Sequence, residues 1–185
     1  MHFFTPLIAL FSLTAAVAAQ SEYKPAGCFV PQVILGSLPN EFTLQLQSEE
    51  HKKTGTLSYK RSKDQYIPGL FGGGEIINST LSNGMLKLDN GPVGYIVEPR
   101  GKPRYLRIQF MNNPKEAAGY EAYYRCYKDK AQLVVRPNSD TGLTFCLFPE
   151  GQRRRDLGLW VKPSSDNSAD CFAVTAVVTD GVRPK

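Results

Sequence analysis

Short stretches in which apolar and polar residues alternate dominate this chain. The clearest is residues 42–47 (FTLQLQ), and residues 54–59 (TGTLSY) follow it after the all-polar segment SEEHKK at residues 48–53. Alternation with a period of two places successive side chains on opposite faces of an extended strand, one face buried and the other solvated. The pattern therefore predicts two antiparallel strands joined by a hairpin loop.

The same alternation continues to the end of the chain. Strand-like segments occupy residues 85–89, 93–97, 105–110, 122–127, 132–136, 143–148, 157–161 and 171–178. Turn signals rich in Gly, Pro, Asn and Ser separate them, which is typical of an all-β sandwich or barrel. We predict a single all-β antiparallel domain of about ten short strands. A β-trefoil is the first choice, because three phrases of the chain look faintly alike, and a sandwich and a closed barrel remain open.

Two segments interrupt the strand pattern. Residues 112–119 (NNPKEAAG) offer the chain's helix-forming material, for which we predict a single helical turn with Pro114 near its start. Residues 67–74 (IPGLFGGG) are rich in Gly but lack the GK[ST] ending and the strand–helix context of a phosphate-binding loop. We predict an exposed loop tip there.

The first residues read as a secretory signal. An apolar core at residues 7–17 contains no Asp, Glu, Lys or Arg, and it is shorter than the about 20 apolar residues that a membrane span needs. The small-residue pattern AVA follows it, as a signal peptidase requires. We predict a signal peptide at residues 1–19, an amino-terminal arm at residues 20–40 and the β domain at residues 41–185. The protein is thus expected to be secreted and extracellular, with no membrane span.

Cysteine usage agrees with an extracellular location. The four cysteines Cys28, Cys126, Cys146 and Cys171 all follow the predicted signal peptide, and their spacing matches no compact zinc pattern. An even number in an oxidising compartment indicates two disulfides. Of the three possible pairings we favour Cys146 with Cys171, because both lie on apolar segments near the end of the chain. That choice leaves Cys28 to tie the arm to the domain through Cys126.

Charge restricts the partners only weakly. Lys and Arg number 22 against 17 acidic residues, a formal net charge of +5. Such an excess permits attraction to an anionic polysaccharide or another anionic surface without requiring it. A dedicated nucleic-acid-binding protein carries a denser basic face with aromatic platforms, so we predict no specific nucleic-acid partner.

The catalytic options are few. His51 is the only histidine after the predicted signal peptide, and no G-x-S-x-G motif is present. One histidine does not build the common His-based zinc or copper centres, so we predict no metal, no cofactor and no catalytic residue. A hydrolase that uses two carboxylates across a cleft stays open. Its candidate acids are Glu75, Asp89, Glu98 and Glu121.

Tyrosines crowd the segment GYEAYYRCY. On a strand, Tyr123, Arg125 and Tyr127 share one face, and Tyr120 and Tyr124 lie on the other. Exposed tyrosines beside an arginine can stack on sugar rings or bases. The alternative is that one face is core and the other is a cross-strand aromatic ladder. Tyr123, Arg125 and Tyr127 are therefore candidate binding residues.

Residues 143–163 (LTFCLFPEGQRRRDLGLWVKP) combine the longest basic run with the only tryptophan. Alternation predicts a β-hairpin in which Cys146 and Trp160 lie opposite the main apolar face, with Trp160 packing near the proposed disulfide. The tip carries Arg153, Arg154 and Arg155. These arginines are a candidate contact for an anionic partner and, in a secretory pathway, a possible protease site, although an uncut loop is favoured.

The sequon Asn78-Ser-Thr80 is the only N-x-[ST] motif in the chain. In a secreted protein it makes Asn78 a candidate for N-glycosylation, with an unused site on a strand as the alternative.

Several features together resemble a known group of proteins. The FTLQ strand at residues 42–45, the four cysteines, the Gly-punctuated middle and the CFAVTA strand at residues 171–176 are loosely similar to small secreted fungal proteins. Within that group the chain resembles the cell-wall proteins needed for phialide and conidium development. The resemblance implies a β-rich protein of the cell wall and carries over no functional residue.

The sequence thus predicts a secreted, non-catalytic protein, associated with the cell wall or binding a surface or polysaccharide. Two alternatives stay open: a small secreted effector or toxin that recognises a host molecule, and a carboxylate-dependent hydrolase of wall polysaccharide. Neither the ligand nor the oligomeric state follows from the residues.

Overall fold

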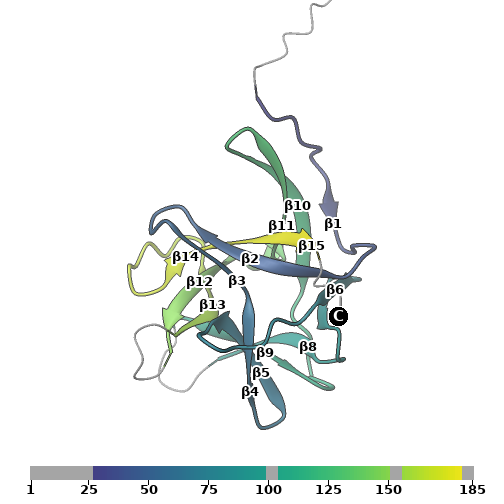
Figure 1. Ribbon diagram of the computed structural model, residues 1–185, viewed down its shortest axis with the longest axis vertical. Coiled ribbons are helices and arrows are strands. Elements are labelled where there is room, and N and C mark those ends of the chain that lie inside the picture. Colours follow the sequence, from purple (N-terminus) through teal and green to yellow (C-terminus); the bar gives the residue numbers. More distant parts are fainter. Residues whose placement is uncertain (1–26, 99–103, 151–155, 181–185) are drawn as a thin grey trace, which may run out of the picture.

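The computed structural model describes residues 27–98, 104–150 and 156–180 (Figure 1). Within these ranges the chain forms fifteen β-strands and one short 3-10 helix, η1 (Ser139–Thr141). The predicted all-β class is confirmed, with more strands than expected. The helical turn predicted at residues 112–119 is wrong, because this segment bends without forming a helix. Residues 1–19 lie outside the described ranges, so the signal peptide stays a prediction.

The first eight strands are β1 (Ile34–Leu35), β2 (Phe42–Ser48), β3 (Lys53–Thr56), β4 (Ser58–Ser62), β5 (Gln65–Leu70), β6 (Ser79–Ser82), β7 (Met85–Leu88) and β8 (Val93–Val97). The other seven are β9 (Leu106–Met111), β10 (Tyr120–Tyr127), β11 (Lys130–Pro137), β12 (Leu143–Pro149), β13 (Leu157–Pro163), β14 (Phe172–Ala173) and β15 (Thr175–Asp180). None of the described residues belongs to a helix long and apolar enough to cross a membrane.

All fifteen strands belong to one antiparallel sheet. Its main order is β1-β10-β11-β15-β2-β6-β7-β8-β9-β5-β13-β12-β14, with β3 paired to β2 and β4 to β5. The sheet curls into a half-barrel (Figure 1). Of the three architectures predicted from the sequence, the barrel is the nearest to this shape. Strand β11 pairs with β10 and β15, whereas β12 pairs with β13 and β14. No strand pairing joins β11 to β12, so the curled sheet is open between these two strands.

Two predicted strands are each divided at a single buried residue. Leu57 separates β3 from β4, and Val174 separates β14 from β15. Both side chains are buried, and their backbone N–H groups donate to the carbonyls of Leu44 and Phe145. The chain changes partner at each break: β3 pairs with β2 but β4 with β5, and β14 pairs with β12 but β15 with β11 and β2. These breaks are the corners at which the sheet bends.

The predicted loop tip at residues 67–74 is wrong over its first half, which forms the end of β5. Gly69 pairs with Gly158 of β13. A Cβ atom on Gly69 would lie 2.2 Å from the carbonyl oxygen of Leu157, so only glycine lets the two backbones approach this closely. The glycine that suggested a loop is therefore required by strand packing.

The inward side chains form one large apolar core. It contains, among others, Phe42, Leu44, Leu86, Ile108, Phe145 and Val174. Trp160 does not belong to this core and lies in a second cluster.

That second cluster lies on the other face of the β12–β13 hairpin. It consists of Tyr105, Cys146, Trp160 and Cys171, with Phe148 packed against it. Cys146 and Trp160 are paired across the hairpin, which confirms that Trp160 packs beside the disulfide. The indole N–H of Trp160 donates to Glu150 at 3.2 Å, and Glu150 pairs with Arg107 at 2.8 Å. The disulfide and this ion pair together cover an otherwise solvated sheet face.

Both favoured disulfides, Cys28–Cys126 and Cys146–Cys171, are formed. They differ in exposure. Cys146 and Cys171 are fully buried, whereas Cys126 is exposed near the tip of the β10–β11 hairpin and Cys28 is half-buried before β1.

This difference predicts stepwise reduction. A reductant's thiolate must reach a disulfide sulfur before exchange occurs. Under native conditions we expect dithiothreitol to reduce Cys28–Cys126 first, while Cys146–Cys171 reacts only when the domain opens. Alkylation at successive times followed by peptide mass spectrometry measures the order. Equal labelling of all four cysteines in the folded protein would contradict the prediction.

Two tyrosines lie inside the core. Tyr59 and Tyr120 are each 2% exposed. The Tyr59 hydroxyl lies 3.4 Å from that of Ser79, whereas the Tyr120 hydroxyl has no hydrogen-bond partner among the described residues. Burial raises the pKa of both phenols well above the usual value. The nearby Tyr59 raises the pKa of Tyr120 further. The contact with Ser79 lowers the pKa of Tyr59 and so partly offsets the effect of burial there.

These pKa shifts predict a loss of stability at alkaline pH. Above about pH 10 the unfolded phenols ionise while the folded ones keep their protons, so unfolding releases protons and becomes more favourable as pH rises. Each phenol contributes about 1.4 kcal/mol per pH unit to this slope. Tyr120→Phe should reduce the slope and leave the free energy of unfolding near neutral pH unchanged or higher, since it removes an unpaired buried hydroxyl. Urea unfolding across pH measures both the slope and the free energy of unfolding at neutral pH, with Tyr66→Phe, at a half-buried tyrosine, as control. An unchanged slope in Tyr120→Phe would show that the Tyr120 phenol does not cause the loss of stability.

Candidate binding surface

The outer face of the sheet carries the tyrosine and arginine side chains singled out in the sequence. Strand register pairs Tyr123 with Val134, Val134 with Val177 and Val177 with Gln45. Paired residues of antiparallel strands share a face, so the outward side chains of β10, β11, β15 and β2 form one surface. Val134 and Val177, which lie on the same face, are buried. We call the polar and aromatic side chains of this surface the polar face; its members are Tyr123, Arg125, Tyr127, Gln132, Thr175, Gln45 and Gln47.

Arg125 is the centre of the polar face. Its Nε donates to Gln132 at 3.1 Å and its Nη1 to the hydroxyl of Thr175 at 3.0 Å. The same guanidinium reaches Gln47 and Glu49, each at 3.4 Å. One side chain thus links β10, β11, β15 and the end of β2, because a guanidinium offers several donors in a rigid plane.

Amide groups extend this network along the surface. Gln132 donates to the carbonyl oxygen of the Gln47 side chain at 3.3 Å, and Gln47 donates to that of Gln45 at 3.0 Å. The result is a row of amide and hydroxyl groups held in fixed orientation. Groups ordered before binding lose less conformational entropy when a ligand arrives.

The two tyrosines of the face are held by cations. The guanidinium of Arg136 lies 4.4 Å from the ring centroid of Tyr123. Arg125 and Lys128 lie 5.1 and 5.2 Å from that of Tyr127. Both rings are half-buried. Cation–π contacts therefore fix the ring orientations, and the tyrosine row, one of the two possibilities that the sequence left open, is partly covered.

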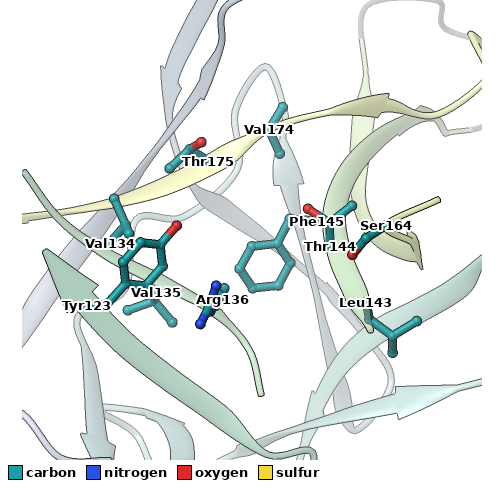
Figure 2. Close-up of a pocket in the computed structure, with 10 residues that line it drawn as sticks. All are labelled: Tyr123, Val134, Val135, Arg136, Leu143, Thr144, Phe145, Ser164, Val174 and Thr175. Carbon is teal, nitrogen blue, oxygen red and sulfur yellow. The ribbon is translucent and has the colours of Figure 1, made fainter. Parts of the chain in front are cut away.

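A groove lies beside the polar face. One hollow of about 150 Å³ occupies the opening between β11 and β12, and Figure 2 shows its lining side chains: Tyr123, Val134, Val135, Arg136, Leu143, Thr144, Phe145, Ser164, Val174 and Thr175. A second hollow of about 240 Å³ is lined by Gln47, Glu49, Glu50, Thr144, Ala173, Val174 and Thr175. Because Thr144, Val174 and Thr175 line both hollows, the two adjoin. We call them together the groove.

The four acids considered for a hydrolase lie on separate parts of the sheet. Glu75, Asp89 and Glu98 are exposed and follow β5, β7 and β8. Glu121 on β10 is buried and pairs with Arg136 at 2.6 Å, and it also accepts a hydrogen bond from Ser139. Among the described residues, no group of three or more His, Cys, Asp or Glu side chains is placed to hold a metal.

The remaining sequence candidates are placed as follows. Arg153, Arg154 and Arg155 lie outside the described residues, so their contact with an anionic partner stays a prediction. Asn78 lies just before β6, half-buried, and its amide donates to Glu41 at 3.4 Å. Its glycosylation also stays a prediction. His51 lies in the turn after β2, with its ring 4.5 Å from that of Phe172.

Sequence reasoning missed the groove. Thr144, Ser164 and Thr175 come from β12, the turn after β13 and the start of β15, and none belongs to a local motif. The sequence did point to the adjoining face, through the alternation that groups Tyr123, Arg125 and Tyr127 on one side of β10.

Comparisons with models of protein families, with curated proteins and with solved structures find no match to this chain. The likeness to phialide and conidium cell-wall proteins therefore stays a prediction, and functional inference depends on the geometry of the polar face and the groove.

The ion pair below Tyr123 generates a stability prediction. Arg136→Ala would leave the buried Glu121 carboxylate without its cation, so we expect a loss of about 1–3 kcal/mol in the free energy of unfolding. Adding Glu121→Gln removes the unpaired charge and should restore part of the loss. Chemical denaturation of both single variants and the double variant gives the coupling energy. A coupling energy near zero would show that the pair does not stabilise the fold.

Proposed function

We propose that this protein is secreted and binds cell-wall polysaccharide through the polar face without catalysing a reaction. The observation that carries the proposal is the network around Arg125, which holds amide, hydroxyl and tyrosine groups in one ordered surface. A polysaccharide presents hydroxyl groups together with the apolar faces of its sugar rings. Amides and hydroxyls match the former, and tyrosine rings match the latter.

Rigidity supports the proposal. The polar face is built on strands, and its longest side chains are already hydrogen-bonded to one another, so little ordering is left to binding. The two disulfides support secretion, because such bonds form and persist in oxidising compartments. Association with a fungal cell wall is an extension from the sequence resemblance.

Ion pairing bears on the hydrolase alternative. Glu49, Glu121, Glu150 and Asp156 each contact a cation, the partners being Arg125, Arg136, Arg107 and Lys60. A glycosidase needs two carboxyl groups facing the sugar across a cleft. Of the acids considered for a hydrolase, Glu121 is thus engaged with the protein's own cation, and Glu75, Asp89 and Glu98 follow three different strands, which favours a binding role over a catalytic one.

One observation favours a second candidate, recognition of a host protein. Phe29 is 94% exposed and Ile34 is 59% exposed, both in the arm that Cys28 attaches to β10. Large exposed apolar side chains on one short segment are typical of protein contacts. Pull-down of host proteins with the wild-type chain and with Phe29→Ser tests this role.

The main proposal is tested by co-sedimentation of the secreted protein with insoluble β-glucan, chitin and cellulose. We expect binding to at least one of them, weakened about 2- to 10-fold by Tyr123→Ala or Tyr127→Ala through loss of ring contacts. Tyr66→Ala, a half-buried tyrosine on β5, is the matched control and should bind like the wild type.

Release of reducing sugar is measured in the same samples. Failure of the wild type to bind any of the three polysaccharides would refute the proposal. Sugar release that a Glu or Asp substitution abolishes would favour the hydrolase instead.

A further inference from the structure

We infer that the groove binds an uncharged, hydroxyl-rich pyranose chain laid across both hollows. This inference rests on the proposed function and adds to it a ligand class and residues outside the polar face. It follows from three properties of the groove: its shape, its hydrogen-bonding groups and its balance of charge.

The shape favours an extended ligand. The hollows of about 150 and 240 Å³ adjoin at Thr144, Val174 and Thr175, and the first is bordered by the ring of Tyr123 (Figure 2). Two adjoining hollows suit consecutive units of a chain better than one compact molecule. Phe145 and Val174 supply apolar surface to the first hollow, beside the hydroxyl groups of its lining.

The hydrogen-bonding groups of the groove include three hydroxyls with unused capacity. Thr144 lines both hollows, and its hydroxyl has no hydrogen bond to the described residues. The hydroxyl of Thr175 accepts from Arg125 and still has a proton to donate. Ser164 donates to the carbonyl of Gly142 at 3.0 Å and can still accept. Hydroxyls that can both donate and accept match the hydroxyls of a sugar.

The charged groups of the groove include no unpaired cation. Arg136 in the first hollow pairs with Glu121, and Glu49 in the second pairs with Arg125. Glu50, 78% exposed, also lines the second hollow, 3.9 Å from His51. The lining thus contains no cation without an acidic partner, although the whole chain has a formal charge of +5. An anionic polymer gains little attraction here, whereas an uncharged chain meets no repulsion.

Calorimetric titration with three oligosaccharides tests the inference: a β-1,3-glucan hexamer, a chitin hexamer and an oligogalacturonate. We expect one or both uncharged hexamers to bind, with the same affinity at low and high salt, because screening affects only charged partners. The two uncharged arms distinguish a glucan from a chitin source. The oligogalacturonate should bind more weakly than the preferred hexamer.

Substitution of Thr144 tests the site itself. Thr144→Val removes one hydroxyl with little change in volume and should weaken binding roughly 3- to 10-fold, the value of one neutral hydrogen bond. Thr144→Ser keeps the hydroxyl and should bind like the wild type. Thr56→Val makes the same change on the exposed strand β3, outside both hollows, and serves as control. Thermal unfolding of all three variants checks that each is folded.

The outcomes separate the two proposals. If the wild type binds a polysaccharide but Thr144→Val matches Thr56→Val, the groove is not the site, and the polar face still is a candidate. Preferred binding of the oligogalacturonate with strong salt dependence would also overturn the inference and point to an anionic ligand. If the wild type binds no polysaccharide at all, both proposals fail.

Discussion

One antiparallel sheet must curl around one apolar core, and the corners that this curling requires determine most of the remaining structure. At Val174 the side chain turns into the core and the backbone N–H donates to Phe145, while the strands on either side take different partners. The chain thereby leaves β12, which pairs with β14, and continues as β15 between β11 and β2. The same corner leaves the wall open between β11 and β12, so the groove is a direct consequence of how the sheet bends.

The disulfides act at the two places where the sheet alone buries little. Cys146–Cys171 lies in the second cluster with Trp160 and closes the outer face of the β12–β13 hairpin. Cys28–Cys126 holds the arm, whose β1 has only two residues, against the β10–β11 hairpin. A short edge strand contributes little burial, so a covalent bond supplies what packing does not. The two bonds also differ in exposure: Cys146–Cys171 is buried, whereas Cys28–Cys126 is accessible.

Net charge alone is a poor guide to the ligand of this protein. The chain is basic overall, yet the cations beside the groove are already paired with Glu49 and Glu121. Since electrostatic attraction depends on the local arrangement of charge, the groove, whose cation is already paired, and the predicted basic tip at residues 153–155 point to different ligand classes. The polar face adds a surface whose donors and acceptors are ordered in advance. Both features favour recognition of hydroxyl groups over recognition of anions.

Local alternation by itself determined the all-β class, most strand positions and the facing of individual side chains. The separation of Trp160 and Cys146 from the main core and the grouping of Tyr123 with Arg125 both follow from a period of two, which needs no knowledge of neighbours. The sequence also predicted the correct disulfide pairing, because Cys146 and Cys171 both lie on apolar segments near the chain end, and such segments pack together. Only the tertiary structure decided that Gly69 lies in a strand, because the requirement for glycine comes from the carbonyl of Leu157, 2.2 Å from where a Cβ atom would lie. It also decided that Thr144, Ser164 and Thr175 line one groove, since residues on separate elements meet only after a sheet has chosen its partners and its corners.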